Sequence, residues 1–308
     1  MTESRWTTRF LSHALTVLLL LLLLLSNPAS AQDTSVSEHD ADINGVTIHY
    51  LRAGSGDPVV LVHGYPENSH TWRHVIPALA RYYTVIVPDT RGTGGSSITP
   101  DFQVRDVAED IHGLVHQLGF RRIFLVGHDF GVPVVSAYAA LHRDEMRALV
   151  VAESPLSAYG LEALYTKYWH FGFLASKYAL LLVGDNIGPF FRQFAFSDFV
   201  YQKAAFSKSE IDGYVAAEAR PGRLDAGFAY YRALQKAEPF FAKFVAPPWR
   251  FPVLTLDGDH SFNGLTATSF RRVAPNLTAR IVPSSGHFVQ EEQPLFVSRT
   301  LLEFFRAH

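Results

Sequence analysis

The chain has 308 residues, of which 48% are hydrophobic and 18% charged, so it can bury the core of one large domain. Its formal net charge of −2 and pI near 6.7 exclude an extended basic surface, and we expect no binding to nucleic acid. The chain contains no cysteine, which excludes disulfide bonds and a lipid-modified N-terminal cysteine. This composition favours a globular protein that acts on small molecules.

The first 31 residues have the three parts of a secretory signal peptide. Arg5 and Arg9 precede an apolar segment at 14–25, which is followed by Ala29-Ser30-Ala31. This pattern predicts cleavage after Ala31 and export to the periplasm or the medium, with no membrane contact after cleavage. The alternative is an uncleaved anchor, but the apolar segment is shorter than the roughly 20 residues that a spanning helix needs.

Strand-like and helical segments alternate along most of the remaining chain. Residues 32–41 are polar, and we expect a disordered lead-in there. Continuous apolar, Val-rich runs predict buried strands, and longer runs between them predict helices. The predicted strands are 46–51, 59–62, 84–87, 123–126, 149–151, 253–256 and 279–282, and the predicted helices include 104–118 and 132–141. The alternation predicts an α/β fold with a mostly parallel, doubly wound central sheet.

The sequence between Pro155 and Pro247 is rich in aromatic residues and lacks strand-like runs. We interpret 155–247 as a helical cap inserted between two parts of the sheet domain, 32–154 and 248–308. Such a cap would cover the carboxyl ends of the strands, where ligands bind in sheets of this kind.

The segment Gly127-His128-Asp129-Phe130-Gly131 has the form of a nucleophile elbow, with a strand predicted before it and a helix after it. Asp129 occupies the position of the nucleophile. A carboxylate there suits attack on an sp³ carbon, which leaves an alkyl ester that water must hydrolyse. The alternative is that Asp129 only caps the helix, since Asp is a favoured N-cap residue.

Further candidates for this chemistry follow other predicted strands. Tyr65, in His63-Gly64-Tyr65-Pro66, is expected to supply one backbone N–H of an oxyanion hole, and Phe130 the other. His287 follows the last strand, where a base that activates water is expected. Two acids remain candidates for orienting His287: Glu153, favoured because it ends an apolar strand beneath the cap, and Asp259.

The other histidines carry weaker signals. His63 and His128 flank tight turns, which favours structural roles. His112 and His116 have the i, i+4 spacing of a metal pair, but Gly113 stands where the His-Glu-x-x-His motif needs glutamate. The sequence therefore predicts no metal site, and nothing in it indicates a cofactor.

Taken together, these motifs resemble the α/β-hydrolase superfamily and, within it, the epoxide hydrolases with an Asp nucleophile. The resemblance rests on His63-Gly64-Tyr65-Pro66, Pro88-Asp89-Thr90-Arg91-Gly92 with Gly94 and Ser96, the Asp129 elbow, and Ser284-Ser285-Gly286-His287-Phe288. Within this group the chain resembles in particular the Cif-type secreted bacterial enzymes, which share the signal peptide, a Glu where Glu153 stands here and two cap motifs. Those motifs stand here as Trp169-His170-Phe171-Gly172-Phe173 and Phe228-Ala229-Tyr230-Tyr231-Arg232-Ala233-Leu234.

The resemblance implies that His170 and Tyr231 donate to the oxygen of an opening epoxide, with the epoxide and water as substrates. Cif-type sequences lack an acid where Asp257-Gly258-Asp259 stands here, which keeps Asp259 open as an alternative partner of His287. The sequence also leaves open whether the chain forms a homo-oligomer.

Two other functions compete with this one. A haloalkane-type dehalogenase uses the same Asp ester, but it needs N–H donors for the halide, and Phe130 and Phe171 have none in their side chains. Fluoroacetate is also disfavoured, because Gly131-Val132-Pro133 stands where its carboxylate-binding arginines are expected. The second competitor is a secreted binding or effector protein without turnover, which the fold alone would permit.

Overall fold

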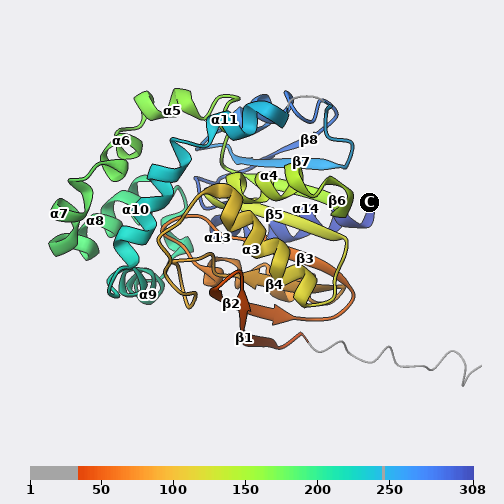
Figure 1. Ribbon diagram of the computed structural model, residues 1–308, viewed down its shortest axis with the longest axis horizontal. Coiled ribbons are helices and arrows are strands. Elements are labelled where there is room, and N and C mark those ends of the chain that lie inside the picture. The colour runs from red at the N-terminus through yellow and green to blue at the C-terminus, as the bar shows by residue number, and fades with distance from the viewer. Residues whose placement is uncertain (1–33, 245–246) are drawn as a thin grey trace, which may run out of the picture. The chain divides into compact units, whose positions relative to one another are not determined.

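The computed structural model describes residues 34–244 and 247–308, and it is built around an eight-stranded sheet (Figure 1). The strand order is β1-β2-β4-β3-β5-β6-β7-β8. The strands are β1 (Val36–Ile43), β2 (Val46–Ala53), β3 (Asp57–Val62), β4 (Tyr83–Pro88), β5 (Ile123–His128), β6 (Met146–Ala152), β7 (Val253–Gly258) and β8 (Thr278–Val282). β1 and β2 pair antiparallel with their neighbours, and β4, β3 and β5 to β8 are parallel. The predicted mostly parallel α/β sheet is confirmed.

Central strands are buried on both faces because helices cover each side of the sheet. Successive side chains of β3 point to opposite faces. Val60 and Val62 belong to the core beneath α3 (Val104–Gln117) and α4 (Gly131–Leu141). Val59 and Leu61 belong to the core beneath α2 (Ile76–Leu79) and α14 (Pro294–Arg306). Because both faces are buried, the sequences of these strands are continuous apolar runs.

The expectation of disorder at 32–41 is wrong for most of that segment. Val36–Ile43 forms the edge strand β1, which pairs with β2 from Val36↔Ala53 to Ile43↔Val46. Most of its side chains are exposed, so it carries the polar sequence of an edge strand. The overlooked signal is Asn44-Gly45, a favoured two-residue hairpin turn, in which φ is 52° and 79°.

The described residues between β6 and β7, the segment interpreted as the cap, contain helices and no strand. They include α5 (Glu162–Lys167), α6 (Trp169–Ala175), α7 (Ala179–Val183), α8 (Ile187–Gln193), α9 (Lys208–Glu218), α10 (Arg223–Leu234) and α11 (Glu238–Phe241). Figure 1 shows α6 to α10 together at one end of the sheet. The remaining α-helices of the described residues are α12 (Leu265–Phe270) and α13 (Val289–Glu292).

The predicted signal peptide and its cleavage site lie outside the described residues. Within 34–244 and 247–308, no helix has both the length and the apolar character required to span a membrane.

Candidate active site

Asp129 stands at the turn between β5 and α4, in a backbone conformation that non-glycine residues rarely adopt, with φ at 50°. The turn is tight on both sides. A Cβ atom on Gly131 would collide with the backbone oxygens of Val62 and His63, and one on Gly64 would collide with the Asp129 side chain. The elbow therefore needs these glycines so that β3 and α4 can approach Asp129 closely.

Each carboxylate oxygen of Asp129 has its own partner. The backbone N–H of Tyr65 donates to Oδ1 at 2.9 Å, which places this N–H where one oxyanion-hole donor was predicted. Nε2 of His287 lies 3.3 Å from Oδ2. Phe130 begins the turn into α4, and its N–H as the second donor stays a prediction.

His287 is joined on its other side to Glu153. Nδ1 of His287 lies 2.9 Å from Oε2 of Glu153, whose side chain is fully buried. The Glu153 carboxylate also accepts the backbone N–H of Gly258 and the hydroxyl of Ser261, both at 2.6 Å. These bonds compensate the burial of the carboxylate and fix its orientation toward the imidazole.

Asp259, the other candidate acid, holds the backbone of the loop that carries His287. Its two oxygens accept the N–H groups of Ser284 and Ser285, at 2.9 and 3.0 Å. The structure thus brings Glu153 to the imidazole and places Asp259 at the start of the loop.

The two carboxylates decide the charge of His287. Burial alone would lower the pKa of His287, but its hydrogen bonds to Asp129 and Glu153 outweigh burial and raise the pKa well above its usual value. Burial likewise acts to raise the pKa of Asp129, but the interaction with His287 prevails and lowers it. Asp129 is therefore ionised and opposite a protonated His287 at neutral pH.

A cavity of about 400 Å³ lies between the cap and Asp129. Asp129 and His287 line it from the sheet domain, and His170 on α6 and Tyr231 on α10 line it from the cap. Much of the remaining wall is aromatic, including Phe171, Phe194, Phe199 and Phe262. The cavity can hold a small molecule that contacts both aromatic and polar side chains.

Two of the polar groups that line the cavity, His170 and Tyr231, are neutral at pH 7. Burial lowers the pKa of His170 to about 4, although Asp129 acts in the opposite direction. Burial also raises the pKa of the Tyr231 phenol well above its usual value, and Asp129 adds to this. A neutral imidazole and a neutral phenol each carry one hydrogen to donate.

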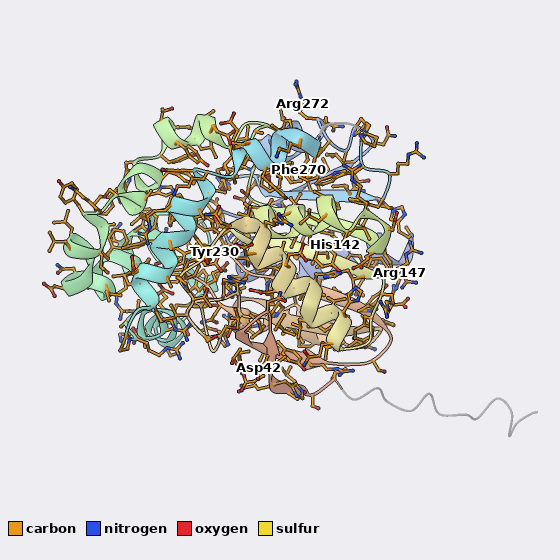
Figure 2. The ribbon with its side chains drawn as sticks, in the orientation of Figure 1. Asp42, His142, Arg147, Tyr230, Phe270 and Arg272 are labelled. Carbon is orange, nitrogen blue, oxygen red and sulfur yellow. The ribbon has the colours of Figure 1, made fainter. Side chains whose placement is uncertain are left out.

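Tyr230 and Tyr231 are adjacent on α10 but have different surroundings. The hydroxyl of Tyr230 (labelled in Figure 2) donates to the backbone oxygen of Arg91 at 2.9 Å, inside the protein. Tyr231 lines the cavity and packs edge-on against Phe130, with ring centroids 4.6 Å apart. Only Tyr231 of the pair is placed to reach a molecule in the cavity.

The sequence favoured a structural role for His128, but it did not indicate that His128 and Glu67 hold the loop that carries His287. Nδ1 of His128 lies 2.8 Å from the carboxylate of Glu67, and Nε2 of His128 lies 2.8 Å from the backbone oxygen of His287. Ser261, which donates to Glu153, was also missed. Each lies near a recognised motif, but no local pattern indicates the contacts, because they join separate strands and loops.

His63, for which the sequence also favoured a structural role, makes local contacts. Its Nδ1 lies 2.7 Å from the backbone oxygen of Gly64, and its Nε2 accepts the N–H of Thr90 at 3.2 Å. These bonds join the two turns that follow β3 and β4.

Residues 57–294 match the family described as alpha/beta hydrolase fold. A soluble epoxide hydrolase from Corynebacterium sp. (strain C12) is 33% identical over 285 residues, which cover 88% of this chain and 98% of that enzyme. A fluoroacetate dehalogenase from Burkholderia sp. is 32% identical over 204 residues, covering 62% of this chain and 67% of that enzyme.

Two solved structures extend the comparison. The epoxide hydrolase CorEH without ligand superposes with a TM-score of 0.84 at 32% identity, covering 89% of this chain and 99% of that one. The Cif epoxide hydrolase from Acinetobacter nosocomialis superposes with a TM-score of 0.81 at 23% identity, covering 87% and 88%, which is a likeness of fold. With its eight-stranded sheet, its elbow at Asp129 and a family match over most of its length, the chain belongs to the α/β-hydrolase fold family.

Proposed function

We propose that this protein is an epoxide hydrolase that forms a covalent ester on Asp129 and hydrolyses it with water activated by His287. The observation that carries the proposal is that His170 and Tyr231, two neutral donors, line the same cavity as the Asp129 carboxylate. Opening an epoxide creates an alkoxide, a strongly basic leaving group that needs such donors. The similarity to epoxide hydrolases over most of the chain supports the assignment.

In the first step, Oδ2 of Asp129 attacks one carbon of the epoxide, and the bond between that carbon and the ring oxygen breaks. The ring oxygen receives a proton from the Tyr231–His170 pair and becomes a hydroxyl group. The product is an alkyl ester of Asp129. Its carbonyl oxygen corresponds to Oδ1, which accepts the N–H of Tyr65.

Esterification removes the negative charge of Asp129, one of the two carboxylates that raise the pKa of His287. We infer that the imidazole then loses its proton more readily and can accept one from water. The resulting hydroxide adds to the ester carbon, and the alcohol leaves with a proton from His287. The proton that His287 first released returns to the cap donor through solvent, and the second proton of the water passes to His287. Ionised Asp129 and protonated His287 are thereby regenerated, and a vicinal diol is released.

The dehalogenase alternative fits this cavity less well. A halide is a weak base and is held by N–H donors rather than protonated. Phe130 and Phe171 lie at two positions where such donors are expected, and Trp169 is 60% exposed. The protein is therefore expected to prefer epoxides to haloalkanes, despite its similarity to a fluoroacetate dehalogenase over part of the chain.

The direct test is a panel of aliphatic and aryl epoxides assayed beside bromoalkanes and fluoroacetate. Diol formation from at least one epoxide, faster than halide release from every haloalkane, is the expected result. Faster halide release would replace the assignment with a dehalogenase. Saturable epoxide binding without diol would instead indicate a binding protein.

We further propose that the mature chain is exported and begins at Gln32, on the basis of Arg5, Arg9 and Ala29-Ser30-Ala31. N-terminal sequencing of protein from the extracytoplasmic fraction tests this. A membrane-bound protein that retains Met1 would contradict it.

A further inference from the structure

A cluster of three histidines and two glutamates lies outside the active site, on the side of the sheet covered by α3 and α4. His112 and His116 are one turn apart on α3, and Glu145 is in the short helix Arg143–Glu145 that follows α4. Oε1 of Glu145 lies 3.2 Å from Nε2 of His112 and 2.9 Å from Nε2 of His116. We propose that His112, His116 and Glu145 bind a divalent transition-metal ion of the zinc class.

The spacing of these atoms fits the proposal. The three ligand atoms all lie within 4.8 Å of one another. Tetrahedral Zn²⁺ with bonds of about 2.0–2.1 Å to nitrogen and oxygen places its ligands roughly 3.4 Å apart. The two measured separations from Glu145 are slightly shorter than this, so small side-chain movements create the site. Solvent supplies the remaining ligand, because all three side chains are 21–27% exposed.

The hydrogen atoms of His112 provide an independent argument. Its Nδ1 faces Oε2 of Glu109 at 3.7 Å, and its Nε2 faces Oε1 of Glu145 at 3.2 Å. A neutral imidazole has one N–H, so it can donate to only one of two carboxylates. In its neutral form the ring therefore faces one of the two carboxylates with a bare nitrogen, and a cation between Nε2 and Glu145 would remove this repulsion.

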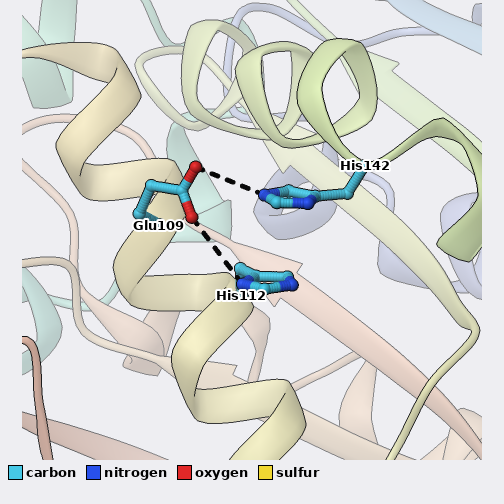
Figure 3. A group of neighbouring side chains, drawn as sticks. All are labelled: Glu109, His112 and His142. Atoms are coloured by element: carbon cyan, nitrogen blue, oxygen red, sulfur yellow. Dashed lines mark ion pairs between the residues drawn. The ribbon is translucent and has the colours of Figure 1, made fainter.

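The side chains around the proposed ligands are already placed to hydrogen-bond to them, as in known metal sites. Ligating histidines usually donate their second N–H to a carboxylate, and Glu109 stands at Nδ1 of His112 for this purpose (Figure 3). The other oxygen of Glu109 lies 3.3 Å from Nε2 of His142, whose ring stacks on His112 with centroids 3.8 Å apart. Tyr138 donates to Oε2 of Glu145 at 2.6 Å and so orients the ligating carboxylate.

One neighbour must move when the ion binds. Arg121 lies 3.3 Å from Nδ1 of His116 and donates to it. When Nε2 binds a metal, the hydrogen of the neutral ring is on Nδ1, so Arg121 has to turn away. Arg121 is exposed and can do so. The charges of Glu109 and Glu145 compensate those of the ion.

The sequence indicated two of the three proposed ligands, His112 and His116. The i, i+4 pair was visible, and Gly113 correctly excluded the catalytic His-Glu-x-x-His motif. The missing ligand comes from beyond α4, which packs alongside α3. The ion would therefore join the C-terminal ends of α3 and α4 and stabilise their packing.

The test uses untagged protein, freed of metal by a chelator, and isothermal titration with Zn²⁺ and, separately, Mg²⁺. We expect one Zn²⁺ per chain, no Mg²⁺ binding, and a higher Tm with Zn²⁺. His116→Gln should weaken Zn²⁺ binding at least tenfold and abolish the rise in Tm, whereas Tyr138→Phe should weaken it about 10–100-fold, as for outer-shell partners. The control His39→Gln alters an exposed histidine on β1 and should leave binding unchanged.

Absence of Zn²⁺ binding to the wild-type protein, or equal affinity in His116→Gln and wild type, would overturn the proposal. If His116→Gln does not fold, Co²⁺ bound to the wild-type protein decides the question through its visible absorption. Intense bands of a tetrahedral site with nitrogen and oxygen ligands support the proposal, and the weak spectrum of hydrated Co²⁺ contradicts it.

Discussion

Glu153 and His287 are 134 positions apart in the chain, yet Oε2 of Glu153 lies 2.9 Å from Nδ1 of His287. Both residues follow parallel strands, β6 and β8, whose carboxyl ends lie at the same edge of the sheet. The contact leaves Nε2 of His287 directed at Asp129. Glu153 is therefore placed to select the tautomer and orientation of the imidazole.

Replacing Glu153 should impair ester hydrolysis far more than replacing Asp259. We expect Glu153→Gln to slow this step by up to about 10⁴-fold, the loss seen when the acid of a serine triad is replaced. Asp259→Asn weakens contacts of the loop backbone and should cost much less. Single-turnover kinetics measure both variants. The reverse ranking would assign the orienting role to Asp259.

His287→Gln should trap the covalent intermediate. Asp129 can still attack the epoxide in this variant, but no base activates water, so the ester accumulates. Intact-mass measurement after mixing with an epoxide should show an increase equal to the mass of the epoxide. Asp129→Ser is the matched control and should show no adduct, because serine has no carboxylate. An unmodified His287→Gln protein would contradict the ester mechanism.

Tyr231→Phe should slow ester formation by on the order of 10²-fold or more, the usual cost of losing one donor to a developing oxyanion. Tyr230→Phe is the control on the same helix. It loses the bond to the backbone oxygen of Arg91, a contact of about 1 kcal/mol outside the cavity, so ester formation should change little. Rapid-mixing measurements of the first step compare the two. Equal rates in Tyr231→Phe and wild type would exclude Tyr231 as a donor.

Glu218 should make the stability of the protein depend on pH. It accepts the hydroxyl of Tyr65 at 2.8 Å, and burial raises the pKa of Glu218 from 4.5 to about 8. The folded state therefore keeps a proton that the unfolded state releases, so stability falls as pH rises from about 4.5 to about 8.

Glu218→Gln removes this dependence. The variant should resemble wild type at pH 5 and have a Tm higher by at least about 3 °C at pH 8, since 1 kcal/mol shifts Tm by about 2–4 °C in large domains. Thermal unfolding across this pH range checks the difference. Glu38→Gln, an exposed position on β1, is the control. Parallel Tm curves for Glu218→Gln and wild type would show that Glu218 is ionised in the folded protein.

The sequence alone predicted the features that depend on residues close together in the chain. Apolar runs predicted the central strands because helices cover both faces of a parallel sheet. The glycines around Asp129 predicted the elbow because only residues without a side chain permit such close approach of strand and helix. The same local reasoning failed at β1, where alternation was weak and the Asn44-Gly45 turn was the stronger signal.

The sequence favoured Glu153 and, through the resemblance, Tyr231, but only the tertiary structure showed which candidate of each pair lies at the site. Tyr230 and Tyr231 are adjacent, but successive residues of a helix point about 100° apart, and the packing of α10 directs only Tyr231 into the cavity. Glu153 and Asp259 both follow strands, and the order of β6, β7 and β8 together with the path of the last loop brings Glu153 to His287. These choices depend on contacts between distant segments, for which a single sequence carries no local pattern.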